Sequence, residues 1–529
     1  MIHADDTALA GAQPNEETLG LARNVSTRYL AIGAEMAIGI LMLPFNVAHL
    51  GTAAYGLWVL TTSITTYFSV LDLGYSGALV KFVAEYRARR DGRALNEILS
   101  TTFYLFTAVG VITYLVAIVV ALFLGRIFHL SPEQIHLGRI VLLVVSVNAA
   151  AGMAFTVFGG VINGFQRYDL NNIVGTISSV VTAIVNVLVL VAGYGLVELV
   201  VATTAVRLLT YGVYRANAYR VFPGLRIRWS LFSLARLREV TTFSVYMALI
   251  NWANKLNYSV DALVIGAFMN TSAVAVWAVG QRLAETTQRM TNQLNDVLFP
   301  TVVANDTSQR LDRLRLIFLV GTRLSLAAVV PIGGVVTLMA SPLVEAWVGP
   351  EFAGSAIVVQ LLALGVIARV GTATAGTVLK GAGRHRLVAY SNIAAALANL
   401  VLSIALVGSL GLEGVAIGTL LPVSVLAMFV LFPAGCRHVQ LTVWRGFVEA
   451  VWPAAWPAAV MAGYVALTRS VVGDSLVAVG AEMVAAVAVY AITFLTLGVS
   501  TSERRFYMSK VGELGGRLGL HAPIVSEGA

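Results

Sequence analysis

Residues 50–60, LGTAAYGLWVL, resemble residues 269–279, MNTSAVAVWAV, and the alignment pairs threonine with threonine and tryptophan with tryptophan. Two further pairs follow at nearly the same interval: VINGFQR (161–167) with VLKGAGR (378–384), and GLVELVVAT (195–203) with GLEGVAIGT (411–419). Glycine and arginine agree in these pairs as well as aliphatic residues. The pattern therefore predicts an internal duplication of the chain.

The composition indicates a membrane protein. Of the 529 residues, 58% are hydrophobic and only 12% are charged, the mean hydropathy is +0.82, and soluble domains carry about 25% charged residues. Apolar windows recur along the chain, each of the roughly 20 residues that a helix needs to cross a bilayer. Cys436 is the single cysteine, which excludes an intrachain disulfide and a cysteine-built metal site.

Fourteen stretches of the sequence are predicted to span the membrane. They lie near residues 29–50, 55–80, 102–125, 139–162, 172–194, 196–216, 240–268, 273–303, 316–340, 354–380, 385–409, 412–434, 447–468 and 475–498. The repeat interval contains six of them, an even number, so both copies have the same orientation in the membrane. Parallel repeats of this kind are typical of transporters that bind their substrate between two lobes near the bilayer midplane.

The predicted fold is an all-α polytopic membrane protein, with two six-helix lobes related by duplication and a C-terminal helix pair. The expected segments are a polar cytoplasmic N-terminal tail (1–24), an N-lobe (25–216), a basic cytoplasmic linker (217–239), a C-lobe (240–434), an extra helix pair (435–498) and a cytoplasmic C-terminal tail (499–529). The N-terminal tail lacks the basic start, apolar core and cleavage site of a signal peptide.

Charge alternates between successive loops. Lysine and arginine concentrate in one set of loops, for example KFVAEYRARRD at 81–91 and the stretch 215–238, whereas the other set holds three arginines beside several acidic residues. Excess Lys and Arg marks cytoplasmic loops, so both termini are expected in the cytoplasm. The net charge of +8 therefore reflects mainly the basic cytoplasmic loops, which should also attract anionic lipid head groups weakly. Nucleic acid is not an expected partner.

Two predicted spans carry polar groups at membrane depth. Span 8 has five of them at spacings of three and four residues, which places them on one helical face: Arg282, Glu285, Arg289, Asn292 and Asp296. Span 7 has a similar face with a lysine beside it: Asn251, Asn254, Tyr258 and Asp261, flanked by Lys255. Arg369 lies well inside span 10, and Asp72 lies in span 2.

Charges at this depth are costly unless they line a hydrated cavity or pair with each other. The surplus of cations, Lys255, Arg282, Arg289 and Arg369, predicts an anionic substrate, with phosphate groups or acidic sugars on these side chains. Asn251, Asn254, Tyr258 and Asn292 are expected to contact a glycan. The acidic residues Asp261, Glu285, Asp72 and Asp296 are either counter-charges or ion-coupling sites, and the sequence leaves that choice open.

No motif indicates catalysis. The sequence has no P-loop, no histidine cluster with metal-ligand spacing and no nucleophile–base pairing, and its predicted external loops are short. An enzyme is therefore not expected, nor is a cofactor or a bound metal. An H⁺ or Na⁺ gradient is the expected energy source if transport is coupled to an ion.

The stretch 50–102 resembles the opening of bacterial polysaccharide flippases of the Wzx type, through YGLW at 55–58, LDLG at 71–74 and KFVAEYRARRD at 81–91. These flippases share a superfamily with multidrug and toxin extrusion transporters and lipid II flippases. The resemblance implies alternating access and an undecaprenyl-pyrophosphate-linked oligosaccharide as substrate, moved across the bacterial cytoplasmic (inner) membrane. A monomer is expected, with membrane lipids, a polysaccharide polymerase and glycosyltransferases as its partners in surface polysaccharide biosynthesis.

Two other interpretations remain open. A cation-coupled multidrug efflux antiporter of the same fold favours carboxylates, and Asp72 or Asp261 would serve it, although cations outnumber them. A membrane scaffold of a cell-envelope assembly complex transports nothing, and it would not need the buried charges.

Overall fold

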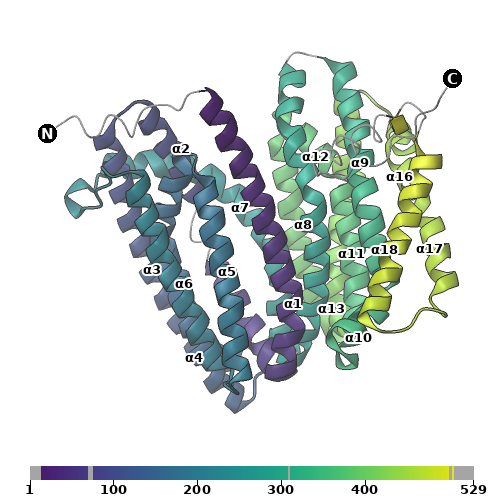
Figure 1. Cartoon of the computed structure of the whole chain (residues 1–529), viewed down its shortest axis with the longest axis horizontal. Coiled ribbons are helices and arrows are strands. Elements are labelled where there is room, and N and C mark those ends of the chain that lie inside the picture. The colour runs from purple at the N-terminus through teal and green to yellow at the C-terminus, as the bar shows by residue number, and fades with distance from the viewer. Residues whose placement is uncertain (1–13, 69–74, 308–309, 500–502, 506–529) are drawn as a thin grey trace. The chain divides into compact units, whose positions relative to one another are not determined.

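The computed structural model describes residues 14–68, 75–307, 310–499 and 503–505, and every regular element in these ranges is helical (Figure 1). The first part of the chain forms α1 (Pro14–Phe68), α2 (Tyr75–Ala88), α3 (Gly92–Ile127), α4 (Pro132–Gly164), α5 (Tyr168–Val191), α6 (Leu196–Val221) and α7 (Leu234–Phe268). A short 3₁₀ helix, η3 (Trp229–Leu231), lies between α6 and α7.

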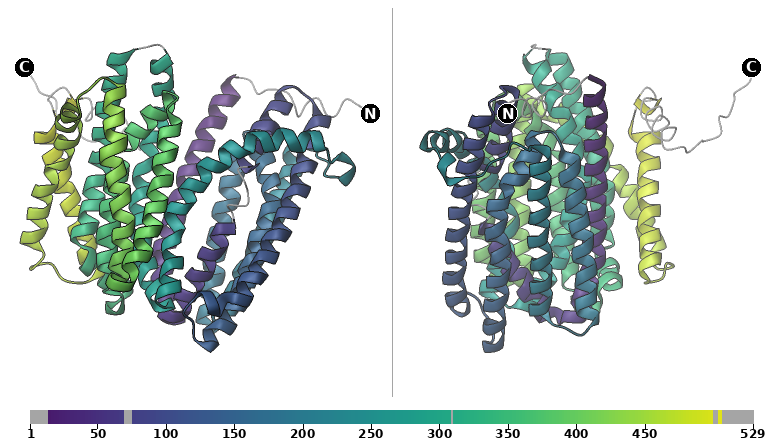
Figure 2. Two further views of the ribbon diagram at one scale, coloured as in Figure 1. Left: turned by 180° about the vertical axis from the view of Figure 1, so that it is seen from behind. Right: turned by 60° about the vertical axis from the view of Figure 1, so that its left-hand side comes forward.

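The second part is helical as well. It forms α8 (Thr271–Thr307), α9 (Leu311–Leu338), α10 (Ala340–Val348), α11 (Ser355–Gly371), α12 (Ala373–Gly381), α13 (His385–Leu426), α14 (Phe432–His438), α15 (Val443–Gly446), α16 (Trp452–Ala455), α17 (Pro457–Thr468) and α18 (Leu476–Thr493). The later helices α17 and α18 pack against each other as a pair (Figure 2).

Ten helical segments among the described residues are long and apolar enough to cross a membrane. The prediction of an all-helical polytopic membrane protein is thus confirmed. Two of the ten contain a sharp break, because Gly51 in α1 has φ 75° and Gly411 in α13 has φ 57°. Backbone at positive φ is easily reached only by glycine, so these residues separate two straight stretches within each long helical range.

The chain divides into two compact units. The first comprises residues 1–282 with 392–422, and the second comprises residues 283–391 with 423–529. In the first unit, a large apolar core joins α2, α3, α4 and α6 around Leu95, Phe106 and Phe158. In the second, a smaller core joins α9, α12 and α14 around Phe318, Val378 and Cys436.

Small residues let the helices approach closely, as is common in membranes, where association depends on packing. A Cβ added to Gly110 of α3 would lie 2.5 Å from the carbonyl oxygen of Ala150 in α4. Within α13, Gly414 and Gly418 form a G-x-x-x-G pair after the break at Gly411, and an added Cβ at Gly418 would lie 2.5 Å from Ser403 Oγ. The two stretches of α13 thus pack against each other across these glycines.

Two equivalent contacts occur in the two halves of the sequence. Gly164 at the end of α4 packs against Val83 of α2, and Gly381 at the end of α12 packs against Val302 of α8. The glycines occupy matching positions of VINGFQR and VLKGAGR, and the valines are separated by the same interval as Leu50 and Met269. In each half, a valine side chain therefore packs against a glycine at the corresponding position.

The junction of α7 and α8 packs tightly within the first unit. A Cβ on Gly56 would collide with the backbone carbonyl of Thr271, and Gln134 Nε2 donates to Thr271 Oγ1 at 3.0 Å. His129 Nδ1 lies 2.5 Å from the carbonyl oxygen of Ala267. Backbone atoms, which move less easily than side chains, set this spacing.

Replacing Gly56 by Ala is expected to lower the free energy of unfolding by about 1–3 kcal/mol, because the added Cβ must displace the Thr271 backbone. Thermal unfolding of the detergent-purified protein measures this change. Gly212→Ala is the matched control, since nothing lies within 4 Å of an added Cβ there, and it should be neutral or stabilising. Equal stability of both variants would contradict the close approach.

Candidate substrate and ion sites

Seven of the predicted site residues have side chains outside the described residues. They are Asp72, Asn251, Asn254, Lys255, Tyr258, Asn292 and Asp296. Their roles remain predictions. Arg282, Glu285, Arg289, Arg369 and Asp261 are described, and they fall into different environments.

Arg282 lies on α8 against a glycine of α1. A Cβ added to Gly39 would occupy the place of the Arg282 guanidinium. Tyr55 is buried and lies within electrostatic range of the same guanidinium. The Arg282 guanidinium of α8 thus lies at Gly39 of α1, where the absence of a side chain makes room for it.

Asp261 on α7 is 4% exposed and lies among oxygen atoms of α13. Thr419 Oγ1 is 3.2 Å from Asp261 Oδ2, 3.4 Å from Asn399 Oδ1 and 3.2 Å from the carbonyl oxygen of Val415. Ser403 Oγ lies 2.8 Å from Asn399 Oδ1 and 3.4 Å from the same carbonyl oxygen. Asn399 and Ser403 are fully buried.

This cluster holds more acceptor oxygens than hydroxyl hydrogens. Each hydroxyl has one hydrogen, yet the Thr419 hydroxyl faces three acceptors and the Ser403 hydroxyl faces two. The Asn399 side chain also carries two N–H donors, and turning its amide over would let it donate to both hydroxyls. The buried Asp261 carboxyl group beside hydroxyl and carbonyl oxygens is a candidate site for H⁺ or a hard cation, which prefers oxygen ligands.

The sequence prediction included Asp261 but missed Asn399, Ser403 and Thr419. A signal for one of them was present, because GLEGVAIGT at 411–419 ends on Thr419 and is one of the repeated stretches. Nothing in the local sequence pairs that threonine with α7. The glycines of α13 bring its two stretches together and so place Thr419 beside Asn399.

Glu285, Arg289 and Arg369 all belong to the second unit. Glu285 and Arg369 are partly buried, whereas Arg289 is exposed. Arg369 lies in the last turn of α11, next to the break at Thr372 that separates α11 from α12. Arg369 lies inside the candidate membrane span Ser355–Gly381. Each of the three residues interacts with other groups in the structure.

An ordered polar network lies at the ends of α2 and α3 near the start of α7. Tyr86 Oη donates to Glu239 at 2.8 Å, and Arg236 bridges Glu239 at 3.1 Å and Glu97 at 3.4 Å. Burial, and then the hydrogen bond to Glu239, raises the pKa of Tyr86 to about 12. The phenol therefore stays a neutral donor, and the network fixes α7 against the first helices.

A family model described as a polysaccharide biosynthesis protein matches residues 49–357, more than half of the chain. The chain belongs to this family. The match contains both α7 and α8, the helices that carry Asp261 and Arg282. The probable flippase AglR of Haloferax volcanii is 22% identical over 408 residues, which cover 76% of this chain and 80% of that relative.

Solved structures show the fold of this family member. A lipid II flippase MurJ in an inward closed conformation matches with a TM-score of 0.72 at 14% identity, covering 92% of this chain and 99% of that one. An inward-facing multidrug resistance MATE transporter of the MOP superfamily matches with a TM-score of 0.64 at 17% identity, covering 77% and 94%. The fold that the resemblance predicted is confirmed, and the family is one of transporters rather than enzymes.

Gly39→Val is expected to displace the Arg282 guanidinium while leaving the fold intact, since the obstructing atoms are the far end of a flexible side chain. Labelling of Arg282 by an arginine-specific dicarbonyl reagent, quantified by peptide mass spectrometry, should increase. Gly33→Val is the control on the same helix, because nothing lies within 4 Å of an added Cβ there. Equal labelling in the two variants would show that the Arg282 guanidinium does not lie against Gly39.

Proposed function

We propose that the protein is a flippase that moves an anionic lipid-linked oligosaccharide, carried on undecaprenyl pyrophosphate, across the bacterial cytoplasmic membrane by alternating access. Membership of the polysaccharide biosynthesis family carries this proposal, and the name of the relative AglR, a probable flippase, supports it. The arginine seated at membrane depth on Gly39 supports an anionic passenger.

The proposed architecture has fourteen membrane-spanning helices in two six-helix lobes with a C-terminal pair. The breaks at Gly51 and Gly411 support two crossings in each of α1 and α13. Helices α7 and α8 have 35 and 37 residues, long enough to cross although they are more polar. The equivalent contacts of Gly164 with Val83 and of Gly381 with Val302 support the duplication.

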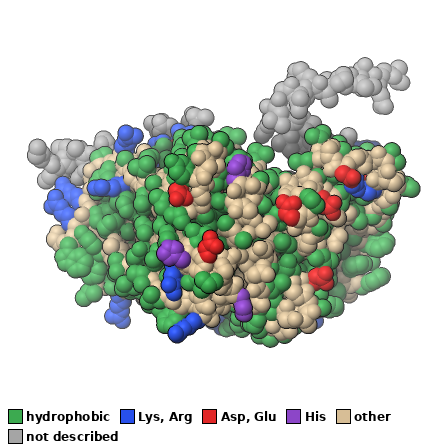
Figure 3. All heavy atoms as spheres, turned by 90° about the horizontal axis from the view of Figure 1, so that it is seen from below, with side chains coloured by type: hydrophobic (Ala, Val, Ile, Leu, Met, Phe, Trp, Pro, Cys, Tyr) green, Lys and Arg blue, Asp and Glu red, His purple; other side chains and the backbone are tan. Residues whose placement is uncertain are grey.

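The proposed orientation places both termini in the cytoplasm. The basic linker between α6 and α7 and the basic end of α2 then lie on the cytoplasmic side. Figure 3 views the opposite end of the molecule, where acidic and histidine side chains appear among hydrophobic ones beside a few Lys and Arg. Such a mixed surface suits the external side.

We propose that phosphates or acidic sugars bind to four cationic side chains, those of Lys255, Arg282, Arg289 and Arg369. The neutral polar side chains would contact the glycan: Asn251, Asn254, Tyr258 and Asn292.

The substitutions Arg282→Ala and Arg289→Ala are each expected to reduce complementation of a flippase-deficient strain by about 10- to 100-fold, the loss typical of one hydrogen bond to a charged group. Expression and thermal stability should stay normal. Arg310→Ala, an exposed cation, is the control and should complement fully.

Normal complementation by both variants would contradict the proposed substrate site and favour a scaffold, which needs no buried charges. Drug resistance conferred by the wild-type chain, with no lipid-linked intermediate accumulating in a deletion strain, would instead favour the multidrug antiporter. That alternative shares the fold, but the cationic side chains give it no support.

We further propose that Asp261, with Asn399 and Thr419, binds the coupling ion, H⁺ or Na⁺. The burial of the Asp261 carboxyl group beside Thr419 Oγ1 is the observation that favours it. Glu285, Asp72 and Asp296 are then counter-charges. Binding to the folded state alone stabilises a protein by about 2.7 kcal/mol at a hundredfold excess over Kd.

Na⁺ or acidic pH is accordingly expected to raise the melting temperature of the wild-type protein, and Asp261→Asn is expected to abolish the rise. Thr419→Val should weaken it, whereas Asp474→Asn, an exposed external carboxylate, should not. The same shift in wild type and Asp261→Asn would place ion binding elsewhere.

A further inference from the structure

The side chains of α3 hold the linker between α6 and α7, residues 222–233, along one edge of the helix. Asn96 donates to the carbonyl of Gly224 at 2.9 Å and accepts from the amide of Arg226 at 2.7 Å. Ser100 Oγ donates to the carbonyl of Arg226 at 3.1 Å and accepts from the amide of Arg228 at 3.2 Å. These side chains of α3 thus supply hydrogen-bond partners for the N–H and C=O groups of the linker backbone and hold the linker in place.

The same bonds leave cationic and aromatic side chains of the linker exposed. Trp229 is 66% exposed, stacks on Phe232 at 5.2 Å between centroids, and meets Tyr104 of α3 edge-on at 4.8 Å. Arg226 and Arg228 are exposed, and no acidic group that the structure describes pairs with either of them. Tryptophan beside arginine is typical of the membrane–water interface, where anionic head groups lie.

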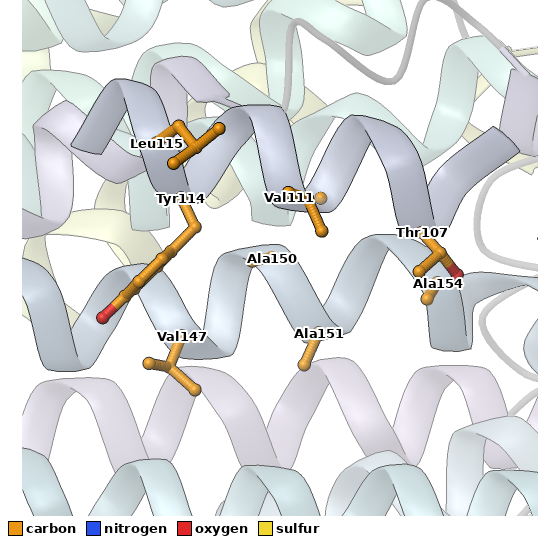
Figure 4. Close-up of a pocket in the computed structure, with 9 residues that line it drawn as sticks. Thr107, Val111, Tyr114, Leu115, Val147, Ala150, Ala151 and Ala154 are labelled. Carbon is orange, nitrogen blue, oxygen red and sulfur yellow. The ribbon is translucent and has the colours of Figure 1, made fainter. Parts of the chain in front are cut away.

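An apolar groove begins one turn along α3 from Tyr104. Its volume is about 380 Å³, and its lining includes Thr107, Gly110 and Val111 of α3 and Ala151 of α4 (Figure 4). Thr107 and Ala154 lie at one end of the groove, and Tyr114 and Val147 lie at the other. Tyr104, Thr107 and Val111 share one helical face at spacings of three and four, so the groove continues the face that meets Trp229.

The groove suits a hydrocarbon chain. Its lining is almost entirely apolar, and the Thr107 hydroxyl is already bonded to the carbonyl of Phe103 at 2.8 Å. From Thr107 to Leu115 it runs roughly 12 Å along α3, close to the ~15 Å thickness of one leaflet of the hydrocarbon core. The only polar groups among its lining side chains are the hydroxyls of Thr107 and Tyr114, too few to hold a glycan. A single acyl chain fits it better than a glycan-bearing substrate.

We propose that the groove and the linker form one binding site for an anionic phospholipid of the cytoplasmic leaflet. The acyl chain lies between α3 and α4, and the phosphate binds Arg226 and Arg228, whose planar guanidinium groups match phosphate oxygens. Trp229 lies at the glycerol level. The leaflet rests on the orientation under the proposed function, whereas the site itself does not depend on transport.

Binding of phosphatidylglycerol to the full-length protein, measured by native mass spectrometry in detergent against phosphatidylcholine, tests the site. The double variant Arg226→Ala/Arg228→Ala is expected to weaken phosphatidylglycerol binding by about 10- to 30-fold, at the usual gain per cation near an anionic surface, and to leave phosphatidylcholine unchanged. Ala151→Phe, which fills the groove from its open side, should weaken binding of both lipids.

Arg310→Ala/Arg313→Ala removes the same charge from two exposed arginines at the start of α9 and should retain wild-type binding. An equal loss in this control would overturn the site in favour of general attraction to basic loops, and unchanged binding in both test variants would overturn it outright. If the two test variants lost binding of undecaprenyl phosphate but kept binding of phosphatidylglycerol, the groove would be a substrate site instead. Each outcome is read from binding, so it stays separate from the complementation assay.

Discussion

Hydrocarbon offers no hydrogen-bond partner, so each polar or charged group inside a bilayer must find its partner within the protein. This constraint explains the described polar sites. Arg282 lies on the open backbone at Gly39, and Asp261 lies among hydroxyl, amide and carbonyl oxygens of α13. Either side chain would be costly facing lipid. The contact with Gly39 and the contact with Thr419 give Arg282 and Asp261, respectively, a defined position.

Glycine supplies that environment in several places. Gly39 makes room for a guanidinium, and Gly414 and Gly418 let the two stretches of α13 approach until Asn399, Ser403 and Thr419 form one polar cluster. Gly110 brings α3 and α4 so close that the small residues beside it leave a groove. Close backbone approach, rather than large side chains, thus creates both the buried sites and the lipid-facing one.

The proposed sites divide the work of a flippase by charge. In the proposed function, the predicted cationic residues bind the pyrophosphate of the substrate, the oxygens around Asp261 bind the coupling ion, and the linker arginines bind lipid head groups. Polar side chains of α3 order the linker that joins α6 to α7. A lipid bound there would stabilise the connection between the first six helices and α7.

Composition, the loop charges and the repeated stretches were enough to predict a polytopic helical membrane protein, and the motifs within 50–102 added the resemblance to this family, because hydrophobic length and short motifs are local properties. They were also enough to single out Arg282 and Asp261, since charge in an apolar helix is visible in one segment. The partners of these residues were decided only by tertiary structure: Gly39 for Arg282, Asn399 and Thr419 for Asp261, and α4 for the groove along α3. Each partner lies on a helix distant in sequence, and helix packing, which depends on where small side chains permit close approach, is not a property of any single segment.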